Sequence, residues 1–96
     1  KVAKRVFSST ELSFASTENE LEMFHILWGI KEAVYKAFGL GGIDFKNQIS
    51  VHPFSYHYPK GSFKADLIKE NQTITYSGTY QFLPEGYVSV YLNEEG

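Results

Sequence analysis

Apolar residues recur at spacings of three and four between residues 18 and 38, and this periodicity predicts a long amphipathic helix. At roughly 100° of rotation per residue, one broad face of this helix is apolar. Its members are Met23, Ile26, Leu27, Ile30, Val34, Ala37 and Phe38. Thr17 offers a cap for the amino-terminal end, and Gly39 fits the carboxy-terminal cap. We expect this face to pack against the core.

A second, narrower face of the same helix carries polar and small side chains. His25, Gly29, Glu32 and Lys36 fall within roughly 60° of each other, at spacings of three and four. Gly29 costs roughly 1 kcal/mol relative to alanine in a helix interior, which indicates that something approaches the backbone closely beside Glu32. An exposed ion pair between Glu32 and Lys36 is the simpler interpretation, and His25 alone is typical of a surface histidine.

Lys31 does not share that polar face. Its direction lies near Phe24 and Leu27, so its ammonium must either reach solvent along the stem or meet an anion. Trp28 and Tyr35 are expected to flank the polar face.

The segments on either side of the long helix are shorter. Ser8 or Ser9 offers the cap of a short helix that extends to Ser16, with Glu11 in its first turn. Residues 40–43 form a glycine-rich loop that suits either a phosphate contact or a plain connection, and no Walker-type G-K-[ST] follows it.

From residue 49 onward the pattern changes to partial alternation in segments rich in Ile, Val, Thr, Tyr and Phe. The predicted strands cover residues 49–54, 62–68, 72–82 and 86–92. Turn-like breaks fall at Lys60-Gly61, Glu70-Asn71 and Pro84-Glu85-Gly86. A cluster of His and Tyr matches no metal-ligand spacing and is expected on a strand edge or loop: His52, Tyr56, His57 and Tyr58. Helices followed by hairpin-spaced strands predict an α+β fold in which a long and a short helix pack on an antiparallel sheet.

The length, composition and charge of the chain exclude several classes of protein. The 96 residues fit one domain over residues 1–96, and eight Phe, seven Tyr and one Trp enlarge its core or leave aromatic surface for a partner. A formal net charge of -2 without a basic stripe argues against a nucleic-acid partner. No apolar run reaches the roughly 18 residues of a membrane span and no secretory signal is visible, so we expect no membrane partner and a cytoplasmic location. The absence of cysteine excludes thiol chemistry and cysteine–zinc sites.

Residues 28–39 follow the spacing W-x-x-K-E-A-x-x-K-x-x-G. This motif resembles the central helix of the 4'-phosphopantetheinyl transferases, which move the phosphopantetheine arm of coenzyme A onto a serine of a carrier protein. Residues 5–11, with the sequence R-V-F-S-S-T-E, are similar to the R-F-F-S-x-x-E segment of the surfactin-type members. Ile43-Asp44-Phe45 and Gly86-Tyr87-Val88 are similar in placement to that family's carboxy-terminal half. The resemblance extends from Lys4 to about Tyr91 and implies one half of a two-lobed fold.

The resemblance also implies roles for individual residues. Glu32 would be a magnesium ligand and, with Lys36, a catalytic residue. Lys31 and Lys36 would contact coenzyme A phosphates, with Lys36 near the leaving group. Magnesium is thus the implied cofactor, coenzyme A the co-substrate, and an acyl or peptidyl carrier protein the partner. Such residues suit displacement at a pyrophosphate, which needs a metal and cations to spread the developing charge.

In this family, further metal ligands lie in a G-[IV]-D-x-E motif just upstream of the R-F-F segment, and the present sequence does not include it. Residues 42–46 imitate the first positions of that motif in a different place, with Lys46 where the acid should be, and we interpret them as unrelated. We therefore expect a missing amino-terminal lobe, or a homodimer with its interface near Trp28 and Tyr35, to complete the enzyme. The isolated chain should then have little activity. The alternative is a non-enzymatic α+β interaction module.

Overall fold

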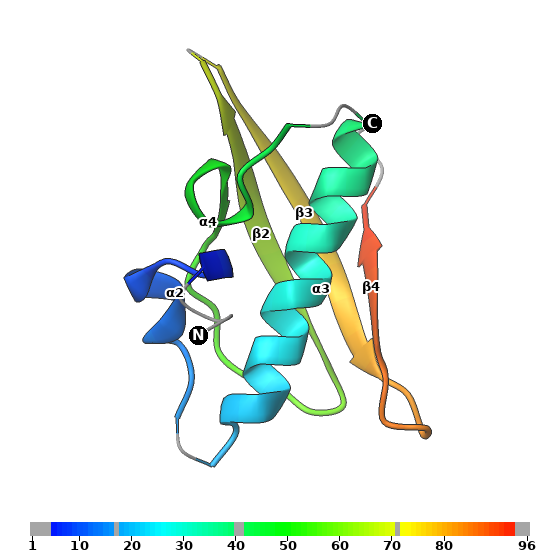
Figure 1. The fold of residues 1–96 in the computed structure, drawn as a ribbon. Helices are drawn as coiled ribbons and strands as arrows, with labels where there is room; N and C mark the ends of the chain where they lie inside the picture. Colours follow the sequence, from blue (N-terminus) through cyan, green and yellow to red (C-terminus); the bar gives the residue numbers. More distant parts are fainter. Residues whose placement is uncertain (1–4, 17, 40–41, 71, 94–96) are drawn as a thin grey trace.

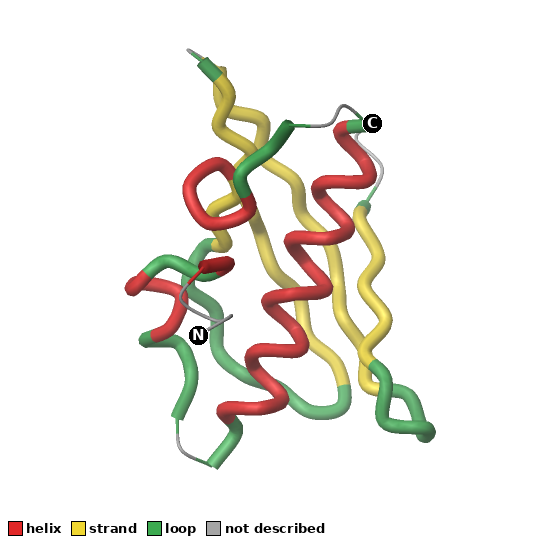
Figure 2. The backbone as a smooth tube through the Cα atoms, viewed as in Figure 1, coloured by secondary structure: helices red, strands yellow, loops and turns green. Residues whose placement is uncertain are grey.

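In the computed structural model, which describes residues 5–16, 18–39, 42–70 and 72–93, a long helix lies across one face of a four-stranded sheet (Figure 1). The helices are α2 (Ser9–Leu12), α3 (Glu20–Phe38) and α4 (Phe45–Gln48). The strands are β1 (Ile49–Val51), β2 (Lys60–Lys69), β3 (Gln72–Phe82) and β4 (Val88–Leu92). Neighbouring strands pair antiparallel in the order β1-β2-β3-β4 (Figure 2). The predicted α+β fold is confirmed.

Helix α3 follows the predicted periodicity. The fully buried members of its apolar face are Met23, Ile26, Leu27, Ile30 and Val34. Ala37 is exposed and Phe38 is half-buried, so the buried face ends one turn before the helix does. Gly39 ends the helix in the left-handed region, with φ at 83° and its N–H bonded to the carbonyl four residues earlier. Asn19 occupies the N-cap without a side-chain bond, and the predicted cap Thr17 lies outside the described residues.

Of the two serines that could cap the short helix, Ser8 is the one that does. The Ser8 hydroxyl accepts the N–H of Glu11, and the Glu11 carboxylate accepts the N–H of Ser8, which completes a capping box. The helix ends at Leu12 instead of reaching Ser16, because hydrogen bonds spanning three residues close its last turn.

The turn predicted at Lys60-Gly61 is wrong. Both residues belong to β2 and pair with β3, where Gly61 lies opposite Tyr80. A Cβ on Gly61 would lie 2.6 Å from the Tyr80 phenolic oxygen. Gly61 therefore leaves room for the buried ring of Tyr80 beside β2. From the sequence alone, a glycine at this position predicts a turn between strands.

The other connections agree better with the sequence. Glu70 has a positive φ of 55° at the β2–β3 turn, while Asn71 lies outside the described residues. The turn over residues 84–86 is confirmed, and Gly86 has a φ of 95°. Strand β1 is three residues long, and residues 52–57 leave the sheet as a loop that carries most of the His and Tyr cluster.

The core lies between α3 and the face of the sheet that it covers. Besides the α3 residues already named, its buried apolar members are Phe7, Ile49, Val51, Phe63, Ala65, Leu67 and Tyr80. Helices α2 and α4 lie on the β1 side of α3, and β4 lies on the other side (Figure 1). This arrangement leaves the polar face of α3 beside β4.

Candidate active site

The polar face of α3 lines a groove between this helix and β4. One part of the groove, about 220 Å³ in volume, is bordered by Glu32 and Lys36 together with Gly29, Ala33, Val88 and Val90. An adjoining part of about 330 Å³ is bordered by His25, Trp28, Gly86 and Tyr87, and it shares Gly29, Glu32 and Val88 with the first. All four residues of the predicted polar face therefore border one continuous groove.

Gly29 explains how the helix comes so near to β4. A Cβ at this position would lie 2.8 Å from Cγ2 of Val90, closer than real Cβ contacts. The close approach expected from the sequence is thus made by the protein's own strand.

Glu32 and Lys36 are not tied to each other. Glu32 is half-buried and Lys36 is exposed. Between these two described residues the structure contains no ion pair; the ion pairs of the described part are Lys31–Glu11 and His52–Asp66. The simple i,i+4 pair considered for the sequence does not form, and both residues border the groove.

Lys31, in contrast, is buried with none of its surface exposed. Its Nζ lies 2.8 Å from Oε1 of Glu11, donates to the Val6 carbonyl at 2.9 Å, and donates to the Phe45 carbonyl. Burial lowers the pKa of the Lys31 ammonium, and the hydrogen bond and negative charge of Glu11 oppose that shift. All three N–H donors are therefore used inside the chain, and none is directed at the groove.

Glu11 is the partner that sequence reasoning missed. Its carboxylate binds Lys31, accepts the N–H of Ser8 at 2.9 Å and accepts the N–H of Val51 in β1 at 2.7 Å. The S-x-x-E spacing places Glu11 at the start of α2, but a contact across 20 residues to Lys31 has no local signal. Of the two alternatives considered for the Lys31 ammonium, reaching solvent or meeting an anion, the second is observed.

Comparison with known families gives a match over residues 1–89 to the model of the 4'-phosphopantetheinyl transferase superfamily. The chain belongs to this superfamily. No curated protein and no solved structure matches the chain. Within the described residues, no helix is both long and apolar enough to cross a membrane.

Members of this superfamily are transferases, and Glu32 is the carboxylate among the described residues that border the groove. Glu32 offers a hard carboxylate oxygen, of the kind that magnesium takes from proteins alongside water and substrate phosphates. In the described part of the chain, no three His, Cys, Asp or Glu side chains gather as a metal cage. The residues thus fit a single protein ligand of a magnesium ion, with the remaining oxygens coming from elsewhere.

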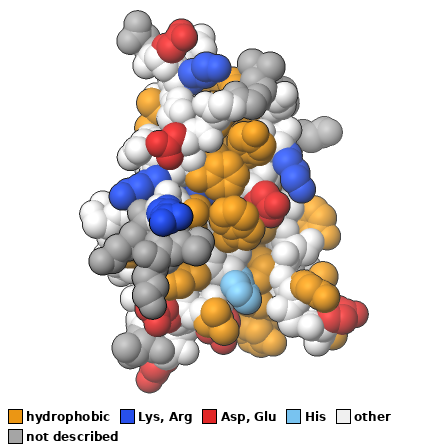
Figure 3. Space-filling model, in the orientation of Figure 1, with side chains coloured by type: hydrophobic (Ala, Val, Ile, Leu, Met, Phe, Trp, Pro, Cys, Tyr) orange, Lys and Arg blue, Asp and Glu red, His pale blue; other side chains and the backbone are white. Residues whose placement is uncertain are grey.

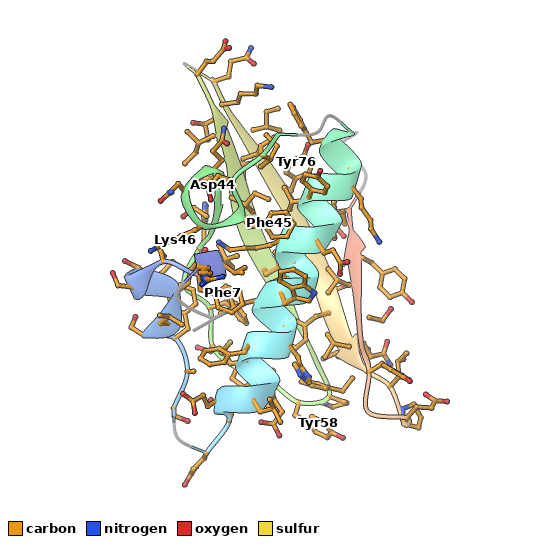
Figure 4. The ribbon with its side chains drawn as sticks, in the orientation of Figure 1. Phe7, Asp44, Phe45, Lys46, Tyr58 and Tyr76 are labelled. Carbon is orange, nitrogen blue, oxygen red and sulfur yellow. The ribbon has the colours of Figure 1, made fainter. Side chains whose placement is uncertain are left out.

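Asp44 does not border the groove. It caps α4, where its carboxylate accepts the Asn47 side chain at 2.8 Å and the N–H groups of Lys46 and Asn47. The hydrogen bond from the Asn47 side chain is the main reason that the pKa of Asp44 lies below its ordinary value. Its role is that of a helix cap, which agrees with the interpretation of residues 42–46 as unrelated to the metal motif (Figure 4).

Aromatic side chains of α3 pack against Phe45, the first residue of α4. The ring of Phe45 lies 5.4 Å from that of Trp28 and 5.2 Å from that of Tyr35, measured between centroids. Figure 3 shows hydrophobic side chains gathered over the middle of α3, with acidic and basic side chains beside them. Of the two residues predicted to flank the polar face, Trp28 borders the groove, whereas Tyr35 packs against Phe45 and is not among the residues that border it.

Proposed function

We propose that this chain carries part of the site at which a transferase moves 4'-phosphopantetheine from coenzyme A to a serine of an acyl or peptidyl carrier protein. The observation that supports the proposal is that a carboxylate, Glu32, and an ammonium, Lys36, border the same end of the α3–β4 groove without forming an ion pair with each other. The superfamily match supplies the reaction class.

Lys36 is exposed and has a flexible stem, so its ammonium suits contact with a phosphate oxygen of coenzyme A. The reaction increases negative charge on the leaving 3',5'-adenosine bisphosphate, and a cation held there stabilises the transition state more than the ground state. Lys36 is accordingly assigned to the leaving group.

Glu32 is one helical turn from Lys36 and is assigned as a magnesium ligand. Magnesium, when bound, would neutralise part of the diphosphate charge as a Lewis acid. Since magnesium prefers near-octahedral oxygen coordination, we assign its other oxygens to water, to the substrate phosphates and to a partner lobe. That lobe is either an amino-terminal lobe or a second copy of the chain.

The chemical step is a displacement at phosphorus. The serine oxygen of the carrier protein forms a bond to the β-phosphorus of coenzyme A, the bond from that phosphorus to the bridging oxygen breaks, and the bisphosphate leaves with the electron pair. The serine proton passes to a base. Lys36 contacts and orients the diphosphate during this exchange, and Glu32 would hold the magnesium ion that offsets its charge.

Lys31 is assigned a different task from the phosphate contact that the resemblance implied. Because its ammonium is held by Glu11 and two carbonyls, it fixes how α3 is rotated about its own axis. Glu32, the next residue, is then turned toward the groove. Lys31 is thus proposed as a positioning residue.

Calorimetric titration of coenzyme A into the chain, with magnesium present, tests the proposal. Lys36→Ala should weaken binding about tenfold, the equivalent of about 1.4 kcal/mol for one charge-assisted contact. Lys64→Ala is the matched control, because Lys64 is exposed on β2 and lies outside this groove, and it should leave binding unchanged. Equal binding by wild type, Lys36→Ala and Glu32→Gln would contradict the proposal and favour the interaction module.

A further inference from the structure

A second pocket lies on the face of the sheet that α3 does not cover. It has a volume of about 460 Å³, within the roughly 300–1,000 Å³ typical of small-molecule sites. Pro53 and Phe54, from the loop after β1, give it apolar surface. Its polar residues come from that loop, from β2, from β3 and from the position after β4, and they are His52, Ser62, Lys64, Ser77 and Asn93.

Strand alternation and register bring most of these polar residues into one row across the sheet. The residues on either side of Lys64 in β2 are buried toward the core, so Lys64 lies on the outer face. Ser77 is its cross-strand partner and therefore shares that face. The His52 N–H donates to the Lys64 carbonyl at 2.8 Å, and the Asn93 N–H donates to the Ser77 carbonyl at 2.8 Å. Four segments of the chain thus contribute to this row.

The charge of the row suits a singly charged anion. Lys64 is exposed and contributes one positive charge. The His52 ring has its Nε2 atom 2.9 Å from Asp66, so any charge on the imidazole is offset by that carboxylate. Among the described residues, no Asp or Glu borders the pocket itself. The row and its direct partner therefore carry at most one net positive charge, which matches a carboxylate better than a phosphate monoester with a charge of about -1.5 to -2.

We infer that this pocket binds a small organic acid, with its carboxylate on Lys64 and its apolar body against Pro53 and Phe54. The ammonium, the Ser77 hydroxyl and the Asn93 amide are donors, and a carboxylate offers only acceptors. The volume also leaves room for more than the carboxylate group. This site is separate from the α3–β4 groove, and the inference does not rest on the proposed function.

The apolar side of the pocket is in place before any ligand arrives. The ring centroid of Phe54 lies 6.1 Å from that of Phe14 and 5.9 Å from that of Tyr80. The Tyr80 hydroxyl accepts the N–H of His57 and donates to its carbonyl, both at 2.9 Å. The loop is therefore held at His52 by Asp66 and at His57 by Tyr80. A preformed wall lowers the ordering cost of binding.

Amide chemical shifts of the 96-residue chain, measured by NMR during titration, test the inference. Benzoate should cause saturable shifts at the amides of His52, Lys64 and Ser77. Three related probes each lack one matched property, since benzamide has no charge, acetate has no apolar body and phenyl phosphate has excess charge. Each of them should need a concentration at least about tenfold higher for half-saturation.

Lys64→Ala should raise the half-saturating concentration of benzoate about tenfold, because it removes one charge-assisted contact. Lys60→Ala is the matched control, since Lys60 is exposed on the same strand and face but does not border this pocket, and it should leave that concentration unchanged. Both side chains are exposed, so circular dichroism should not change.

The results that overturn the inference are distinct. Absence of saturable shifts with benzoate, or shifts that Lys64→Ala leaves unchanged, removes the site. Equal binding of benzamide removes the carboxylate contact, equal binding of acetate removes the apolar wall, and tighter binding of phenyl phosphate assigns the pocket to phosphate instead. Lys36→Ala should leave benzoate binding unchanged, so failure of this inference and failure of the proposed function are told apart.

Discussion

Two lysines five residues apart on one helix have opposite surroundings. Lys36 is exposed at the groove, whereas Lys31 is enclosed among Glu11, Val6 and Phe45, with the Phe7 ring centroid 5.7 Å from its ammonium. A buried charge is tolerated only where partners replace water on every side. The Lys31 site meets that condition, which makes it a structural element and not a free cation.

Lys31→Met should therefore destabilise the fold strongly. Removing the ammonium leaves the Glu11 carboxylate buried with only its two backbone donors, and breaking a buried pair costs about 3–5 kcal/mol. Urea unfolding followed by circular dichroism measures the loss, with Lys64→Met as the exposed control, expected within about 0.5 kcal/mol of wild type. A loss for Lys31→Met of less than about 1 kcal/mol would show that the pair is not a structural centre. If the Met variant does not fold, Glu11→Gln provides the measurement, because it keeps the volume and an acceptor for Val51.

Between elements, the contact of α3 with β4 depends on the missing side chain of Gly29. Alanine here gains helix propensity of roughly 1 kcal/mol but places a methyl group 2.8 Å from Cγ2 of Val90. The branched valine has no flexible end that can move away. The contact with Val90, and not helix propensity, therefore decides whether alanine at this position stabilises or destabilises the protein.

Gly29→Ala should accordingly destabilise the protein, by roughly 1–3 kcal/mol before the propensity gain is subtracted. Val90→Ala combined with Gly29→Ala should recover most of this loss, which single and double variants measure in one thermodynamic cycle. A stabilised Gly29→Ala variant in the wild-type background would sink the idea of a close helix–strand contact.

The opposite face of the sheet is joined by a side-chain bridge across three segments. His52, after β1, lies 2.9 Å from Asp66 in β2, and Thr75 in β3 donates to Asp66 at 2.8 Å. Burial raises the pKa of Asp66, but the hydrogen bonds from His52 and Thr75 outweigh it, so the pKa lies below its ordinary value.

The lowered pKa of Asp66 determines how the stability of the fold changes with pH. A carboxyl whose folded pKa is depressed stabilises the fold above its ordinary pKa of about 3.9 and loses this contribution as the pH falls through the folded value. Asp66→Asn should therefore be less stable than wild type near neutral pH, and the difference should shrink below about pH 4. Urea midpoints at several pH values provide the test, with Glu85→Gln in the exposed β3–β4 turn as control. A difference that does not change with pH would contradict the bridge.

At the scale of the whole molecule, Glu32 is the one carboxylate that borders the groove among the residues that the structure describes. We therefore expect the chain by itself to transfer phosphopantetheine little or not at all, because Glu32 alone does not satisfy magnesium. Adding a lobe that carries a G-[IV]-D-x-E motif should raise the rate, and Glu32→Gln should abolish that gain. Mass spectrometry of the carrier protein detects the added group. Rapid transfer by the monomeric chain alone would refute this expectation.

Periodicity determined the core face of α3, its end at Gly39 and the order of helices before strands, because these features depend on neighbours three, four or two residues away. The common direction of His25, Gly29, Glu32 and Lys36 was predictable for the same reason. The resemblance in the motif identified the superfamily, which the match over residues 1–89 confirms. The roles assigned to Glu32 and Lys36 stay predictions.

Only the tertiary structure decided what approaches Gly29, what lies beneath Gly61 and what neutralises Lys31. Each answer is a residue far along the chain: Val90, Tyr80 and Glu11. Sequence patterns predict on which face of its own helix or strand a side chain lies, but they do not predict which atom of another segment it contacts. That identity follows from how the sheet and α2 close around α3, where packing and charge pairing between distant segments determine each partner.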